Sequence, residues 1–395
     1  MNEMPTPHPP VPFFTRQEYE RRYAKLREMM EREKFDCLVL TGSDNWGKAE
    51  NFALLYVTGL PMMLERSYVV LPKNGPPILF TKKSDFVKMP AMPTSAPVEF
   101  VETDVRPGTR NSENYGAEVA RLIQSIAPKS GRVGLVSEAF FPLETFRQMQ
   151  SAARSVTFHD ATGPFNRIRR TKSAEEIDFL KYSGDAADAA MTALIENVRP
   201  GMTEFDLVNI VDGALTAMGC FPGLLQLVGS GSDFPNYPYL MTGSPKPVGP
   251  NDLVLTELTS NYMGYCTQLG VPISFGAPND EFKRFYDVNE RLYALQMDAF
   301  RPGRSSGEID RLGDQVGKWT NGEMHSYFSC QNVDFEQSFA HEDVVLENGI
   351  GYIIMPWINY VDRRKFTGHS YGKTWVCWND KPIALHKTPM RLVVK

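Results

Sequence analysis

The stretch VRPGMTEFDL at residues 198–207 has a partial copy, FRPGRSSGEIDRL, at residues 300–312. A second matched pair follows, because VGPNDLVLTEL at residues 248–258 corresponds to LENGIGYIIMP at residues 346–356. Each half predicts a helix, a Pro-Gly turn, a second helix and then a strand entered at Gly or Asn. Two matched pairs roughly 100 residues apart predict a duplicated α+β unit, and two such halves would close around a cleft.

The residues before the first copy predict a separate domain. Short apolar runs alternate there with helical stretches, which is typical of an α/β domain. The runs lie at residues 37–40, 67–71, 77–80 and 133–136. The segment RIRRTKSAEEIDFLK marks the boundary, since Ser173 and Glu176 are spaced as the capping box of a long helix. We expect one domain at residues 1–166 and a second at residues 167–395.

Composition narrows the classes of protein. A chain of 395 residues suits two domains, and a net charge of -5 offers no basic surface for nucleic acid. The apolar runs are too short to span a membrane, and the Pro-rich start lacks the layout of a signal peptide. Five scattered cysteines without a CxxC pair indicate reduced thiols. We therefore expect a soluble, cytoplasmic protein that binds neither nucleic acid nor membranes.

Several segments together resemble the creatinase, aminopeptidase P and prolidase family. They are RTKSAEEIDFLK at residues 170–181, ENFALLYVTGL at residues 50–60, the two Arg-Pro-Gly turns and LENG at residues 346–349. Their order and spacing match that family over nearly the whole chain. The resemblance implies a creatinase-type α/β N-terminal domain, an α+β pita-bread C-terminal domain with internal pseudo-twofold duplication, and a homodimer.

Most members of this family hold two divalent metal ions with two Asp, one His and two Glu residues. The resemblance, with Gly264-Tyr265 fixing the register, places Glu257 and Gln268 where the two Asp residues stand. Met355 takes the place of one Glu, and the last Glu falls on or beside Lys373. A carboxylate, an amide, a thioether and an ammonium do not suit two hard cations. We therefore expect a divergent, metal-free member with no other cofactor.

The family's metal-binding His has two possible counterparts here, His325 and Cys330, and both assignments stay open. His325 and His369 are candidate acid/base groups, because imidazole titrates near neutral pH. We interpret the remaining histidines as remote from the site or on the surface; they are His8, His159, His341 and His386.

Creatinase itself works without metal, and it uses a His as its general base. Here the segment DFPNYPYLM, residues 233–241, covers that place and offers Tyr237 or Tyr239 instead. Arg66 matches the creatinase loop Arg that reaches across the dimer to the substrate carboxylate. Glu257 and Lys373 are expected to face each other, either as a charge pair replacing the metal or as a salt bridge that fills the old site.

We therefore predict a metal-independent enzyme that acts by acid/base chemistry on a small carboxylated or aromatic compound, with hydrolysis of a C–N bond slightly favoured. One alternative is a metal-independent lyase expelling a fragment from an aromatic alcohol or acid, and another is a non-catalytic binding module. The predicted catalytic residues are Tyr237, Tyr239, Glu257, His325, His369 and Lys373. The predicted substrate-binding residues are Arg66, Phe234, Gln268, Met355 and Trp357.

Overall fold

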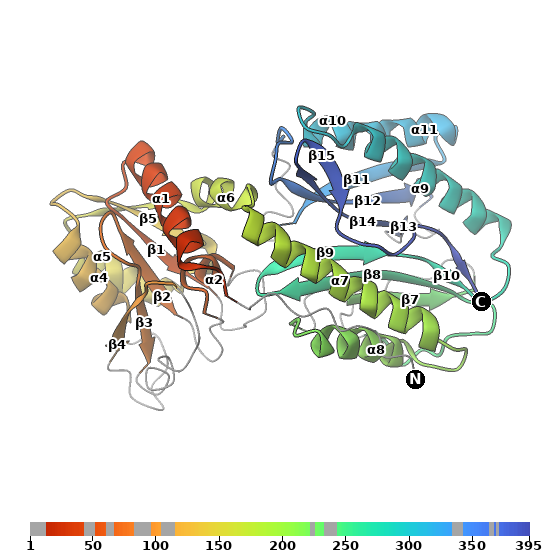
Figure 1. The fold of residues 1–395 in the computed structure, drawn as a ribbon, viewed down its shortest axis with the longest axis horizontal. Helices are drawn as coiled ribbons and strands as arrows, with labels where there is room; N and C mark the ends of the chain where they lie inside the picture. The colour runs from red at the N-terminus through yellow and green to blue at the C-terminus, as the bar shows by residue number, and fades with distance from the viewer. Residues whose placement is uncertain are drawn as a thin grey trace. The chain divides into compact units, whose positions relative to one another are not determined.

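The computed structural model describes residues 13–42, 52–60, 67–82, 96–103, 115–221, 226–232, 243–333, 343–362, 367–368 and 371–395. The chain divides into two compact units, Met1–Arg169 and Arg170–Lys395, both drawn in Figure 1. Within these described ranges, every helix is too short or too polar to cross a bilayer.

The first unit is an α/β domain around a six-stranded sheet, in the order β4-β3-β2-β1-β5-β6. Its strands are β1 Cys37–Thr41, β2 Tyr68–Pro72, β3 Ile78–Lys82, β4 Glu99–Thr103, β5 Arg132–Val136 and β6 Thr157–Asp160. Its helices are α1 Arg16–Glu33, α2 Phe52–Thr58, α4 Tyr115–Ile126, α5 Leu143–Ala152 and α6 Thr162–Arg170. Strands β1 and β2 are buried along their whole length, as expected of apolar strands covered on both faces. The predicted α/β class is confirmed.

The second unit has a long curved sheet flanked by helices (Figure 1). Its strand order is β11-β12-β14-β9-β8-β10-β16, with β7 also paired to β8. The longer strands are β7 Gln226–Gly231, β8 Leu253–Tyr262, β9 Tyr265–Gly270, β11 Met324–Asn332, β12 Gly351–Tyr360 and β14 Gly372–Trp378. The shorter ones are β10 Ile273–Ser274, β13 Thr367–Gly368, β15 Lys381–Ala384 and β16 Val393–Val394. The helices are α7 Ala174–Asn197, α8 Glu204–Ala217, α9 Asp280–Ala299, α10 Ser306–Arg311 and α11 Gln315–Trp319.

The duplication predicted from the sequence is present in the hydrogen bonds of the second unit. In the first copy the N–H of Gly201 donates to the carbonyl of Val248 at 2.8 Å. In the second copy the N–H of Gly303 donates to the carbonyl of Leu346 at 2.9 Å. Both glycines have φ near +90°, at 90° and 86°, which side chains rarely adopt, and this explains the repeated Pro-Gly turn. The pseudo-twofold α+β fold is therefore confirmed.

The capping box predicted at the start of the second unit begins α7. The Ser173 side chain accepts a hydrogen bond from the N–H of Glu176, and the Glu176 carboxylate accepts one from the N–H of Ser173. Replacing Ser173 by Ala should lower the free energy of unfolding by about 1 kcal/mol, because one N–H at the helix start loses its partner. Urea unfolding followed by circular dichroism measures the change. Ser173→Thr, which keeps the hydroxyl, is the control, and equal stability of the Ala and Thr variants would contradict the cap's role.

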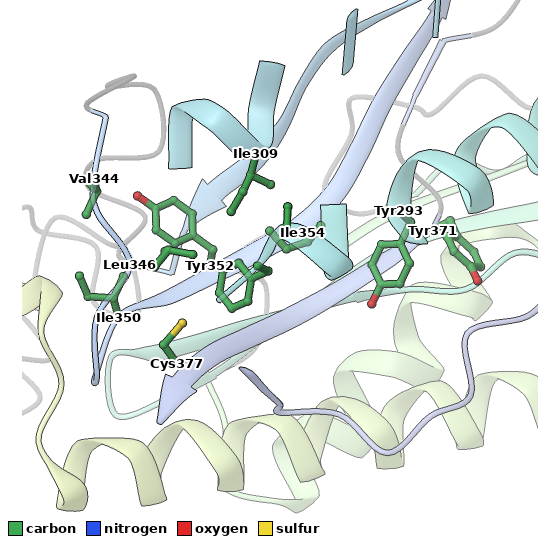
Figure 2. Packing of buried hydrophobic residues seen from close by; sticks show 11 residues of the cluster. Tyr293, Ile309, Val344, Leu346, Ile350, Tyr352, Ile354, Tyr371 and Cys377 are labelled. Carbon is green, nitrogen blue, oxygen red and sulfur yellow. The ribbon is translucent and has the colours of Figure 1, made fainter. Parts of the chain in front are cut away.

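The two faces of the long sheet pack differently. The helix-facing side carries a large apolar cluster in which Tyr371 lies edge-on to Tyr293 of α9, with ring centroids 5.3 Å apart (Figure 2). Trp375 belongs to this side, because its indole N–H donates to the Tyr293 hydroxyl at 2.9 Å. Alternate residues of β12, Ile353 and Met355, pack in a separate small cluster with Val333. Since side chains alternate along a strand, these alternate residues lie on the opposite, inner face of the sheet.

Candidate active site

The site is built on the hairpin of β8 and β9. Its two-residue turn, Met263-Gly264, has both residues in the left-handed region, with φ of 51° and 87°. Such a turn matches the twist of the strands and fixes their pairing. Tyr262 therefore pairs with Tyr265, and Thr259 with Gln268.

Glu257 and Gln268 meet on this hairpin in a buried polar cluster. The Nε2 of Gln268 donates to Glu257 Oε1 at 2.9 Å and to Thr259 Oγ1 at 3.1 Å. Glu257 is 6% exposed, and burial raises the pKa of its carboxyl to about 7, although the bond from Gln268 opposes this rise. A carboxyl group that titrates near neutral pH can both accept and donate a proton, as a general acid/base must.

Lys373 lies on the other face of the sheet, so the predicted Glu257–Lys373 pair is wrong. Lys373 pairs in register with Leu269 of β9 and precedes the helix-facing Trp375 by two residues. Its ammonium donates to the carbonyl of His386 at 3.2 Å. Burial lowers the pKa of Lys373, and the nearby Asp188 carboxylate opposes that shift. The error has a simple cause, since a shift of one residue along a strand moves a side chain to the opposite face.

On β14, the residue that hydrogen-bonds to Gln268 is Thr374. The N–H of Gln268 donates to Thr374 Oγ1 at 2.8 Å, and that hydroxyl donates to the carbonyl of Gln268 at 3.1 Å. The backbone of Gln268 is thus held by a buried hydroxyl while its side chain reaches Glu257.

The other predicted residues of the sheet are spread along β11 and β12. Met355 is buried on the inner face, and Trp357 is half-buried, with its indole N–H donating to Asn359 Oδ1 at 2.8 Å. His325 is exposed on β11, where it pairs with Asn359. Three strands, β12, β14 and β9, separate β11 from β8 in the sheet order, so His325 does not share a strand pair with Glu257.

Several predicted residues fall outside the described part of the chain. They are Arg66, Phe234, Tyr237, Tyr239 and His369, and the side chain of Cys330 is likewise not described. Their roles, and the homodimer contact expected of Arg66, stay predictions.

The sequence interpretation missed His386, which it placed far from the site. Its backbone carbonyl accepts a hydrogen bond from the Lys373 ammonium, and its ring faces the backbone carbonyl of Gln268. No local motif marks this residue. The one available signal was its place a few residues after the strand that carries Lys373.

The described residues do not fit the pair of metal ions that most members of the creatinase, aminopeptidase P and prolidase family hold. Among them, no group of three or more His, Cys, Asp or Glu side chains is arranged to hold a cation. Gln268 directs an amide N–H at the Glu257 carboxylate, where a ligand to a metal would present an oxygen instead. Met355 on the inner face adds only a thioether, and the Lys373 ammonium lies on the other face of the sheet. We therefore derive no chemical step through a metal.

Comparison with known proteins shows the family. Residues 178–390 match the model of Metallopeptidase family M24, and residues 22–171 match that of the Creatinase/Prolidase N-terminal domain. The chain therefore belongs to metallopeptidase family M24.

Individual relatives are peptidases by name. An Xaa-Pro dipeptidase of Lactobacillus delbrueckii subsp. lactis is 28% identical over 214 residues, which are 48% of this chain and 54% of that protein. The probable dipeptidase PepE of Mycobacterium tuberculosis is 25% identical over 59% of this chain and 63% of its own length. The prolidase structure from Pyrococcus horikoshii OT3 matches with a TM-score of 0.76 and 19% identity, covering 94% of this chain and all of that one. The chain spans about half the length of the first of these curated relatives.

These relatives overturn the predicted function. The sequence interpretation expected a metal-independent enzyme of a small carboxylated or aromatic compound, a lyase or a binding module, and it excluded a dinuclear metallopeptidase. The names of the similar proteins include dipeptidases, prolidases and an X-Pro aminopeptidase, and the matching family is one of metallopeptidases. The altered residues at the ligand positions pointed to a metal-free enzyme, whereas the chain as a whole matches the metallopeptidase family.

Proposed function

We propose that this chain is a peptidase that hydrolyses the bond preceding proline in dipeptides or short peptides. The observation that carries this proposal is the match of the chain to Xaa-Pro dipeptidases together with membership of family M24. The two-domain fold, which the chain shares with a prolidase and an X-Pro aminopeptidase over most of its length, supports the same class.

Glu257 is the residue we assign to proton transfer. Its carboxylate takes a proton from water as the water oxygen bonds to the carbonyl carbon of the substrate. When the C–N bond then breaks, the protonated Glu257 returns that proton to the leaving nitrogen. Gln268 and Thr259 support this role, because the amide of Gln268 bridges Glu257 and Thr259 and so fixes the carboxyl group.

The assay is release of free proline from Ala-Pro and Gly-Pro by the purified chain, before and after EDTA and with added Mn²⁺ or Co²⁺. Ala-Ala and Gly-Ala serve as matched substrates that lack proline after the scissile bond, and their cleavage is followed as release of free alanine. We expect kcat/KM for Ala-Pro to exceed that for Ala-Ala by about tenfold or more, as one well-fitted apolar group can supply. Failure to release proline under every metal condition would overturn the proposal.

A further inference from the structure

A short segment behind the sheet ties the site strands to the long helix α7. We name residues 385–388 the strap. At one end the N–H of Leu385 donates to the carbonyl of Thr374 on β14 at 3.0 Å. At the other end the Asp188 carboxylate of α7 accepts the N–H of Lys387 at 2.6 Å and that of Thr388 at 2.9 Å. The mechanism proposed above makes no use of these contacts.

The strap and α7 touch without a side chain between them. A Cβ added at Gly184 would lie 2.0 Å from the carbonyl oxygen of Leu385, well inside any real contact. A helix and a segment in such close approach cannot shift toward each other, because interiors are already close-packed. The position of the strap is therefore fixed against α7.

His386 projects from the strap into the space between α7 and β9. It is 3% exposed, and within the described ranges neither ring nitrogen makes a hydrogen bond of standard geometry. The backbone carbonyls of Gly184 and Gln268 face the ring. The charged groups around it are the Asp188 carboxylate of α7, with an oxygen 4.0 Å from Nδ1, and the Lys373 ammonium of β14.

The ring is neutral at neutral pH. Burial lowers the pKa of His386 to about 4, the Asp188 carboxylate opposes this, and the Lys373 ammonium adds to it. A neutral imidazole carries one N–H donor and one acceptor, so it can donate to one of the two facing carbonyls.

We propose that His386 is a positioning residue for the Glu257–Gln268 pair. The ring lies behind the backbone of Gln268, and the side chain of Gln268 extends from the opposite side to Glu257. A movement of the Gln268 carbonyl toward the space now filled by the ring would carry the amide away from the Glu257 carboxyl. This inference rests on the proposed function only in calling the pair an active site, since the contacts themselves are independent of any substrate.

The test follows Glu257 without a substrate. The free energy of unfolding is measured from pH 5 to 9 for two proteins, one with Glu257 and one with Glu257→Gln. The difference between the two free energies changes with pH until Glu257 is fully ionised in the folded chain. When His386 is present, this difference should become constant above a pH of about 7, and we call that pH the limit. In His386→Phe, which keeps a ring but loses both nitrogens, the limit should rise by about one pH unit, because the bond from Gln268 that favours ionised Glu257 is weakened.

Two further kinds of variant distinguish a positioning role of His386 from a purely stabilising one. Thr388→Val removes a bond of 2.5 Å from the strap to Asp188 but leaves His386 in place, so it should lower stability without moving the pH limit. At least one of His386→Asn and His386→Gln should restore the native limit, since their amides can donate from the places of the two ring nitrogens.

The outcomes are distinct from those of the peptidase assay. A limit that stays near pH 7 in His386→Phe would overturn the positioning role and leave His386 as a core residue. If His386→Phe does not fold, His386→Leu, which also lacks both ring nitrogens, takes its place, and a limit that stays near pH 7 in that variant would overturn the proposal. A chain that releases no proline could still show the shift, so the two proposals fail separately.

Discussion

Replacing Glu257 by Gln is expected to lower kcat/KM for Ala-Pro by a factor of about 100 to 10,000, the range that proton transfer by a positioned side chain supplies. Gln has nearly the same shape as Glu but cannot accept the proton of the attacking water. Steady-state proline release measures the loss. Thr259→Val is the matched control, because it removes the second acceptor of the Gln268 amide at 3.1 Å and leaves the carboxyl intact. Equal losses in the two variants would show that Glu257 does not transfer the proton.

The same carboxyl predicts the pH dependence of both activity and stability. If the ionised form is the base, kcat/KM rises with pH and reaches a plateau above about pH 7. The free energy of unfolding changes with pH in the opposite direction. The folded pKa is above the unfolded value of 4.5, so between 4.5 and 7 the folded chain keeps a proton that the unfolded chain releases. The free energy of unfolding therefore falls as pH rises through that window, by an amount on the order of 3 kcal/mol, and Glu257→Gln should abolish the fall.

Replacing Gly184 by Ala is expected to lower the free energy of unfolding by about 3 kcal/mol or more. The added methyl group would meet the Leu385 carbonyl at 2.0 Å, so either α7 or the strap must move. Urea unfolding measures the change.

Gly213→Ala is the matched control for that experiment. Gly213 also lies within a helix, α8, but a Cβ there meets nothing within 4 Å. Because Ala favours a helix more than Gly does, this control should raise stability by about 0.5 to 1 kcal/mol. Equal stability changes in both variants would contradict the close contact of α7 with the strap.

The features of the fold that the sequence predicted are those encoded locally. The Pro-Gly turns at Gly201 and Gly303 and the cap at Ser173 each depend on a few adjacent residues, and each is present in the structure. The duplicated unit followed from them, because matched local signals in the same order imply matched elements.

The candidate site was only partly predictable, because it depends on register and on distant segments. The resemblance, with Gly264-Tyr265 fixing the register, placed Glu257 and Gln268 at two positions of one site, and in the structure these two side chains share a hydrogen bond. Lys373 was aligned to a ligand position, yet strand pairing sets it on the helix-facing side. His386 meets Gln268 only through the packing of the strap on α7, and no pattern in the sequence reports that contact.

The duplicated strands of the second unit have diverged in chemistry at one shared position. Counting from the start of each matched stretch, Glu257 is residue 10 from Val248 and Met355 is residue 10 from Leu346. One copy has an ionisable group at that place and the other a thioether that packs with Val333 and Ile353. The two copies therefore keep the same backbone fold but differ in the chemistry of this position. A substrate held between the copies would contact a polar surface on one copy and an apolar surface on the other. Two such surfaces suit a substrate with one polar end and one apolar end.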